Sequence, residues 1–292
     1  MSIEVPTSTP TPPAASQSSS QWLPWLALAL MAAVYAPTVA WLVDRWTISV
    51  WQNAHGLLIP PVVAWFCWQE LKRFPREPIT DPGVAGLGLI GAGLGLHIVD
   101  AGLGTQLLSA ASIVVVIPGL SLVFLGRART AAVAFPLVFL AFMLPIPLAL
   151  TERLHMLLRH VAAGAAAAIV PVLGIPVYAE QTTLHIANAT LEVADACSGF
   201  STLYAAMATA FLVAYTAPNW RRRVLVLACA APIAIVANVI RVVLLVVLVY
   251  WQGSDVLATS LHSISGMFTF ALALPVIFWL GGTGRREPVA AS

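Results

Sequence analysis

Long apolar runs alternate with short polar connections along most of the chain. Eight runs are about 20 residues long and lack a two-residue alternation, which is typical of membrane-spanning helices and unlike the strands of a membrane barrel. Lipid offers no partners to backbone N–H and C=O groups, so each run is expected to be helical. The sequence therefore predicts an all-α, polytopic membrane protein. The expected spans are 22–42, 56–72, 84–101, 106–126, 130–149, 197–217, 222–250 and 262–281.

The connection between the fifth and sixth runs, residues 150–196, has a different pattern. It follows Pro145-Ile146-Pro147 and begins with an Ala-rich, amphipathic segment at about 152–173, which predicts a helix. Residues 177–186 and 190–194 then alternate between apolar and polar side chains, with Asn188-Ala189 between them. This second pattern predicts a short β-hairpin.

Composition and the termini support this organisation. The chain is 60% hydrophobic and only 9% charged, whereas soluble domains are roughly 25% charged. Residues 1–20 are rich in Ser, Thr and Pro and predict a disordered tail without the basic start of a signal peptide. The expected organisation is a tail at 1–20, one membrane domain at 21–283 with an insertion at 150–196, and a cytoplasmic tail at 284–292. The sequence predicts no cofactor, metal site or nucleic-acid partner.

The distribution of basic residues predicts the orientation. With a cytoplasmic N-terminus, ten of the fourteen Lys and Arg residues fall inside, and the C-terminus is also cytoplasmic. The segment 150–196 is then outside, so its helix lies on the outer surface or re-enters the membrane. All six histidines fall at or near the outer face. The inner basic residues are Lys72, Arg73, Arg76, Arg127, Arg129, Arg221, Arg222, Arg223, Arg285 and Arg286.

Several local patterns favour structural roles. Residues 86–91 match G-x-G-x-x-G but lie inside an apolar run, which indicates close helix packing rather than dinucleotide binding. Cys67 and Cys229 lie in apolar runs and are expected to be buried as small hydrophobic residues. His155 and His160 are five residues apart, so a helix does not stack them on one face as metal ligands. Serine, zinc and aspartyl intramembrane protease signatures are absent.

Cys197, in Asp195-Ala196-Cys197-Ser198-Gly199, precedes the sixth run on the outer side. The N-terminus of a helix presents unpaired N–H groups and a partial positive charge. Both stabilise a thiolate, which is the nucleophilic form of cysteine. A boundary cysteine without a chemical role explains the position equally well.

Arg241 lies within the seventh run, and an arginine in an apolar span marks a functional site by default. About 20 residues from Arg223 cross the hydrocarbon core, so Arg241 is expected near the outer boundary, level with Cys197. Asn238 lies three residues earlier on the same helix face. His262 opens the last run, also outside. Together they supply a nucleophile, an oxyanion donor and an acid/base; the alternative is an arginine that snorkels to the headgroups.

The order Cys-Ser-Gly, Asn-x-x-Arg and His, each at the outer end of a late membrane helix, resembles the exosortase/archaeosortase family. His55-Gly56-Leu57-Leu58-Ile59-Pro60, at the start of the second run, resembles the early His-Gly-x-Leu-Ile-Pro signature of that family. The resemblance covers roughly residues 22–281.

The resemblance implies a thiol protease and transpeptidase of the bacterial cell inner membrane, with its active site facing the periplasm. Its substrates are membrane-anchored proteins with a C-terminal, PEP-CTERM-like sorting signal: a short motif, a membrane helix and an Arg cluster. The enzyme cleaves near the motif and passes the protein to an acceptor, in a process linked to exopolysaccharide export. Cys197 corresponds to the nucleophile, Arg241 to the electrostatic stabiliser and His262 to the acid/base. Asn238 is a supporting residue, and His55 lines the substrate entrance.

Two other functions remain open from the residues. In a transporter or export channel, Arg241, Asn238 and His262 line a substrate path, although no inverted repeat is visible. A polysaccharide polymerase or ligase uses Arg and His without a nucleophilic cysteine. A stoichiometric adduct of Cys197 with a thiol-directed peptide is expected for the first function alone.

Overall fold

The computed structural model describes residues 22–48, 54–74, 83–193, 199–255 and 260–282. The predicted tails at 1–20 and 284–292 lie outside these ranges. The helices are α1 Leu23–Ile48, η1 Ala54–Leu57, α2 Ile59–Arg73, α3 Val84–Leu103, α4 Leu107–Ala132, α5 Ala134–Phe139, η2 Leu140–Met143, α6 Leu148–Ile169, η3 Val170–Leu173, α7 Phe200–Thr216, α8 Trp220–Gln252 and α9 Ser260–Gly281. The strands are β1 Val177–Glu180, β2 Thr183–Ile186 and β3 Ala189–Glu192.

In the described part of the chain, five helices are long and apolar enough to cross a bilayer: α1, α3, α4, α6 and α8. Three shorter apolar helices cover Ala134–Met143, Phe200–Thr216 and Ser265–Gly281. These helices confirm a helical, multi-pass membrane protein. The number of eight spans and the orientation stay predictions.

The fifth predicted span, 130–149, is wrong as a continuous helix. The backbone of α4 breaks at Gly126, which has φ 77° and ψ 174°, where the fourth predicted span ends. Beyond it α4 continues to Ala132, the short helices α5 and η2 follow, and Leu144 is already extended. Pro145 and Pro147 follow, and proline disfavours the helical conformation in the residue before it.

The predicted β-hairpin is also corrected. The chain forms a three-stranded antiparallel sheet in the order β1-β2-β3. Its first turn is at Gln181, which has φ 53°, so the expected single strand at 177–186 folds into two strands. The second turn falls between Ile186 and Ala189, near the expected Asn188.

The glycine-rich run of α3 packs against α4, as the sequence predicts, and forms no nucleotide-binding turn. A Cβ atom at Gly86 would lie 2.8 Å from the carbonyl oxygen of Gly119, and one at Gly93 would lie 3.2 Å from that of Ser112. Gly88 and Gly91 have no such neighbour within 4 Å. The packing glycines are therefore seven residues apart, at two helical turns, and not at the spacing of the motif.

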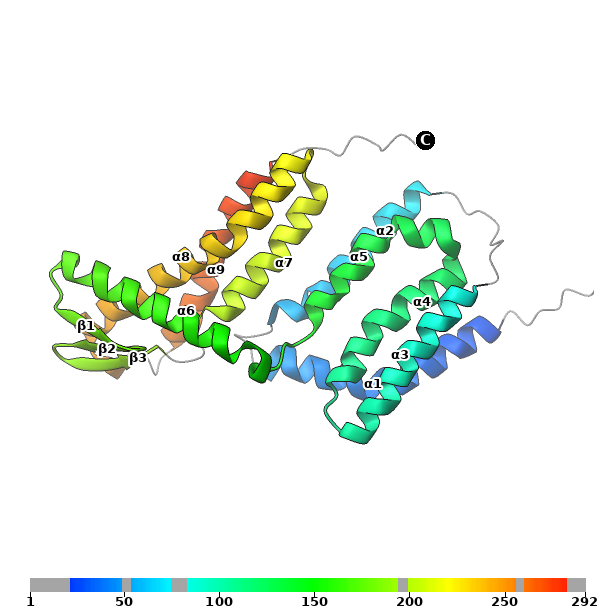
Figure 1. Cartoon of the computed structure of the whole chain (residues 1–292), viewed down its shortest axis with the longest axis horizontal. Coiled ribbons are helices and arrows are strands. Elements are labelled where there is room, and N and C mark those ends of the chain that lie inside the picture. The colour runs from blue at the N-terminus through cyan, green and yellow to red at the C-terminus, as the bar shows by residue number, and fades with distance from the viewer. Residues whose placement is uncertain (1–21, 49–53, 75–82, 194–198, 256–259, 283–292) are drawn as a thin grey trace, which may run out of the picture.

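The helices form two groups, α1–α5 and α6–α9 with the sheet, as Figure 1 shows. One apolar cluster joins α1, α2, α4, α5 and the middle of α7, and another joins α7, α8 and α9. A third cluster packs α6 and the sheet on the C-terminal half of α8. In Figure 1, α6 runs crosswise to α7–α9 near the end where α7 begins. The helix α7 therefore belongs to both groups.

Candidate functional site

Asn238 and Arg241 lie on one face of α8, and both are 4% exposed. The Arg241 Nε atom donates a hydrogen bond to Ser265 Oγ of α9 at 3.0 Å. A Cβ atom at Gly266 would lie 3.5 Å from the guanidinium carbon, so this glycine leaves room for the planar group. Arg241 is thus held between α8 and α9 and does not extend as a freely exposed side chain.

Gly199 brings the start of α7 against Asn238. Its φ is +82°, a conformation that residues with a side chain rarely adopt. A Cβ atom here would lie 2.8 Å from the Asn238 Cβ atom, closer than ordinary contact. Gly199 is therefore required both by its backbone conformation and by the close approach of α8.

Cys197 and the side chain of His262 lie outside the described residues. Cys197 is two residues before Gly199 in the sequence, and position 262 belongs to α9, three residues before Ser265. Residues three apart on a helix share a face, so position 262 and Ser265 lie on the same side of α9. The structure brings Asn238, Arg241 and the residue that ends Cys-Ser-Gly together; the roles of Cys197 and His262 stay predictions.

His55 lies in η1, between α1 and α2, and connects the two helix groups. Its ring meets that of Tyr204 in α7 edge-on, with a centroid distance of 4.9 Å. Burial lowers the pKa of His55 to about 4, although a backbone hydrogen bond at Phe142 opposes this shift. The neighbouring Gly56 is buried beneath Trp46, whose Nε1 atom donates to Met143 O at 3.0 Å. The early signature therefore packs beside the start of α7, and the role of His55 at a substrate entrance stays a prediction.

A transmembrane exosortase family model matches residues 46–279. The chain belongs to the transmembrane exosortase family. This confirms the resemblance found in the sequence and indicates a membrane transpeptidase that acts in protein sorting. Comparisons with curated proteins and with solved structures gave no match.

Two residues beside this site, Ser265 and His155, were not assigned to it from the sequence. Ser265 holds Arg241, and its position one turn after His262 could have indicated it. His155 of α6 is 5% exposed, and its ring lies 4.5 Å from that of Phe200, the first residue of α7. Nothing in the sequence connects His155 with Phe200, because the contact depends on how α6 crosses the bundle.

The other histidines and cysteines lie elsewhere. His160 is exposed and its Nδ1 atom lies 2.8 Å from the carbonyl oxygen of Met156 in its own helix. Cys67 and Cys229 are partly buried in α2 and α8, as expected for small apolar residues. Within the described ranges, no group of three or more His, Cys, Asp or Glu residues is arranged to hold a metal ion.

Proposed function

We propose that this chain is a cysteine protease and transpeptidase that cleaves a C-terminal, PEP-CTERM-like sorting signal at the outer face of the bacterial inner membrane. The observation that carries the proposal is the burial of Arg241 beside Asn238 and Gly199, at a junction of α7, α8 and α9. Placing a permanent charge within an apolar helix costs free energy, and such residues therefore mark functional sites by default. The product is passed to an acceptor, in a process linked to exopolysaccharide export.

In the proposed reaction, the thiolate of Cys197 attacks the scissile carbonyl and forms a tetrahedral intermediate. The guanidinium of Arg241 stabilises the negative charge that develops on the carbonyl oxygen. His262, as imidazolium, protonates the leaving amine, and the bond to nitrogen breaks to give an acyl-thioester. The neutral imidazole then removes a proton from the incoming acceptor, which attacks the thioester and releases Cys197.

The membrane supports such a reaction by bringing the substrate to the right depth. A protein with a membrane helix arrives by lateral diffusion, with its scissile bond near the outer interface. The proposed topology has the N- and C-termini inside, about eight spans, and α6 with the sheet outside. Although α6 is long and apolar enough to cross a bilayer, its path crosswise to α7–α9 in Figure 1 supports an interfacial position. A thioester near lipid is partly shielded from water, which favours transfer over hydrolysis.

A thiol-directed peptide that carries a sorting motif tests the proposal. In membranes that contain the Cys67→Ala, Cys229→Ala variant, the peptide should label Cys197 stoichiometrically, and substrate should compete with it. A transporter or a polysaccharide polymerase gives no such substrate-protected adduct.

Fusions of a topology reporter at Gly126, Glu180 and Gly284 should report an inside, an outside and an inside position. An inside signal at Glu180 overturns the placement of the site.

A further inference from the structure

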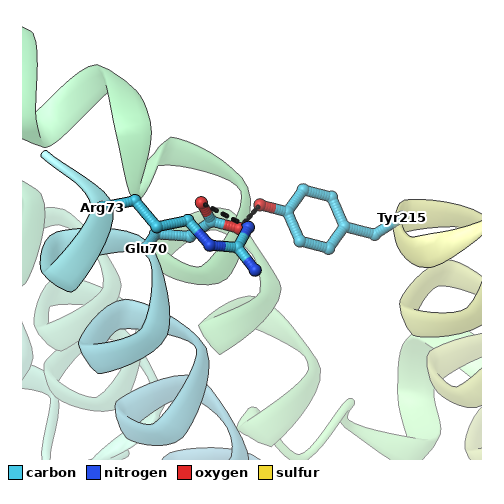
Figure 2. Close-up of polar contacts among 3 residues, drawn as sticks. All are labelled: Glu70, Arg73 and Tyr215. Carbon is cyan, nitrogen blue, oxygen red and sulfur yellow. Dashed lines mark hydrogen bonds and ion pairs between the residues drawn. The ribbon is translucent and has the colours of Figure 1, made fainter. Parts of the chain in front are cut away.

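Glu70, near the end of α2, carries a carboxylate that joins the two helix groups far from Arg241. Tyr215 Oη of α7 donates a hydrogen bond to Glu70 Oε1 at 3.1 Å, as Figure 2 shows. Arg73 Nη1 lies 3.6 Å from Oε2, and the side chains of Glu70 and Arg73 are 13% and 64% exposed. The ion pair is longer than a good hydrogen bond and ends on an exposed arginine, so it binds the carboxylate weakly.

Aromatic rings pack against Tyr215, whose hydroxyl binds this carboxylate. The ring of Tyr215 stacks on Phe135 with a centroid distance of 3.8 Å and meets Phe66 edge-on at 5.9 Å. The Glu70 side chain is only 13% exposed, so its carboxylate is largely shielded from water. A guanidinium or ammonium group at Oε2 would therefore form a stronger contact than it does in bulk water.

The charge at this end of the molecule favours a basic ligand at Glu70. Among the described residues at the predicted inner ends of the helices, Glu70 is the only acidic one. A protein anchored by one helix, with its main part outside, carries Lys or Arg at the inner end of that helix. The surrounding surface repels such residues, since it is itself basic. Its described basic residues are Lys72, Arg73, Arg127, Arg129, Arg221, Arg222 and Arg223.

The length of α7 relates Glu70 to the candidate active site. Gly199 immediately precedes this helix and contacts Asn238, whereas Tyr215 lies near its other end and contacts Glu70. The 16 residue steps from Gly199 to Tyr215 correspond to about 24 Å of helix, close to the roughly 30 Å hydrocarbon core. A membrane helix parallel to α7, with its basic end at Glu70, thus has its outer end at the depth of Arg241.

We propose that Glu70 binds the arginine or lysine at the inner end of the substrate's membrane helix and so sets the depth of the scissile bond. This assignment rests on the proposed function, because it takes a membrane-anchored protein as the substrate. Glu70 is a specificity residue in this arrangement. It recognises the anchor from the opposite side of the membrane to the chemistry.

Binding of three synthetic peptides tests Glu70 without requiring turnover. Each contains Pro-Glu-Pro and an apolar helix of about 20 residues, and they end in an arginine, a glutamine or a glutamate tail. In nanodiscs that hold the Cys197→Ala protein, Glu70→Gln should weaken the arginine-tailed peptide about 10- to 100-fold, the effect of one charge-assisted hydrogen bond. The glutamine-tailed peptide should bind equally to both proteins. Glu70→Arg should in turn prefer a glutamate-tailed peptide.

Tyr215→Phe is the matched control, because it removes the hydroxyl that ties Glu70 to α7 and keeps the ring. If Glu70 only joins α2 to α7, Glu70→Gln and Tyr215→Phe weaken the binding of the arginine-tailed and glutamine-tailed peptides equally, and the assignment is wrong. Equal binding of every peptide to every variant, or no binding at all, also overturns it. Tail-dependent binding with no cleavage by the wild-type protein retains the role of Glu70 and refutes the proposed function instead.

Discussion

Each helix group contains a buried polar cluster, and the two clusters are built differently. In the first group, the hydroxyls of Tyr35 and Ser112 share a hydrogen bond of 2.7 Å. Asp100, which is 1% exposed, accepts a hydrogen bond from Thr105. Asp100 and Thr105 are five residues apart, at the corner between α3 and α4. This carboxylate stabilises a local turn.

In the second group, the buried charge lies between elements distant in sequence. Arg241 and Ser265 are 24 residues apart, on α8 and α9. Asn238 of α8 contacts Gly199, which immediately precedes a third helix, α7. No local turn requires a cation there. Asp100 thus has a structural explanation within a few residues, whereas the position of Arg241 is better explained by chemistry at the junction of three helices.

The largest expected effect concerns the cysteines. Cys197→Ala and Cys197→Ser should both abolish processing of a test substrate, which then accumulates uncleaved in immunoblots. Serine is a poor substitute because its hydroxyl is far less acidic than a thiol. Cys67→Ala and Cys229→Ala should leave processing nearly intact. Continued processing by the triple variant would show that the nucleophile is not a cysteine.

The next comparison is between histidines of the two groups. His262→Ala should reduce the processing rate by about 10²–10⁴, the usual contribution of an acid/base group. The dependence of rate on pH between 5 and 8 should flatten in the same variant. Unchanged turnover over that range would make His262 an interfacial residue.

His55 should behave differently, because burial lowers its pKa to about 4 and keeps it neutral from pH 5 to 8. His55→Gln should therefore retain the pH profile of processing. Since the pKa in the folded state lies below the ordinary 6.5, the stabilisation from neutral His55 is complete above pH 6.5 and is lost as the pH falls towards 4. Thermal unfolding in detergent should be less sensitive to acid for His55→Gln; an unchanged sensitivity contradicts the burial.

Arg241 and Asp100 give the most direct test of the comparison. Arg241→Lys should fold normally yet lose about 10²–10³ in processing rate, because an ammonium lacks the fixed planar donors of a guanidinium. Asp100→Ala should have the opposite effect. Its free energy of unfolding should fall by about 1.5–3 kcal/mol, while the processing rate per folded molecule is retained. Rates are to be normalised to the folded enzyme in the membrane. Wild-type rates from Arg241→Lys would remove Arg241 from the active site.

The sequence predicted those parts of the molecule that depend on local pattern. The apolar runs near α3, α7, α8 and α9 matched their helices within a few residues, because lipid requires helices there. The break at Gly126 coincides with the predicted end of the fourth run at residue 126. The turn at Gln181 was missed, since glutamine is not a typical turn residue.

Contacts between distant segments were the harder part of the candidate site. The shared face of Asn238 and Arg241 followed from helical periodicity, but the partner Ser265 did not. The approach of His155 to Phe200 depends on the crossing of α6, which no residue count reveals. The close approach of Gly199 to Asn238 likewise requires the packing of α7 on α8. These are tertiary effects, which neither hydropathy nor helical periodicity encodes.

The smallest expected effects compare glycines of the two groups. Gly199→Ala places a side chain at positive φ and against Asn238, so α7 or α8 must move. A displacement approaching 1 Å at a reacting centre lowers the reaction rate about 10²-fold. We therefore expect Gly199→Ala to lower processing by up to that factor, with the protein still inserted.

Gly91→Ala is the matched control in α3, because its Cβ atom would have no neighbour within 4 Å. Alanine favours a helix over glycine by about 0.5–1 kcal/mol, so this variant should be slightly more stable and process substrate at the wild-type rate. Thermal unfolding and in-cell cleavage of both variants, measured together, separate the effects. Equal losses from the two substitutions would mean that Gly199 acts through general helix packing and not through its contact with Asn238.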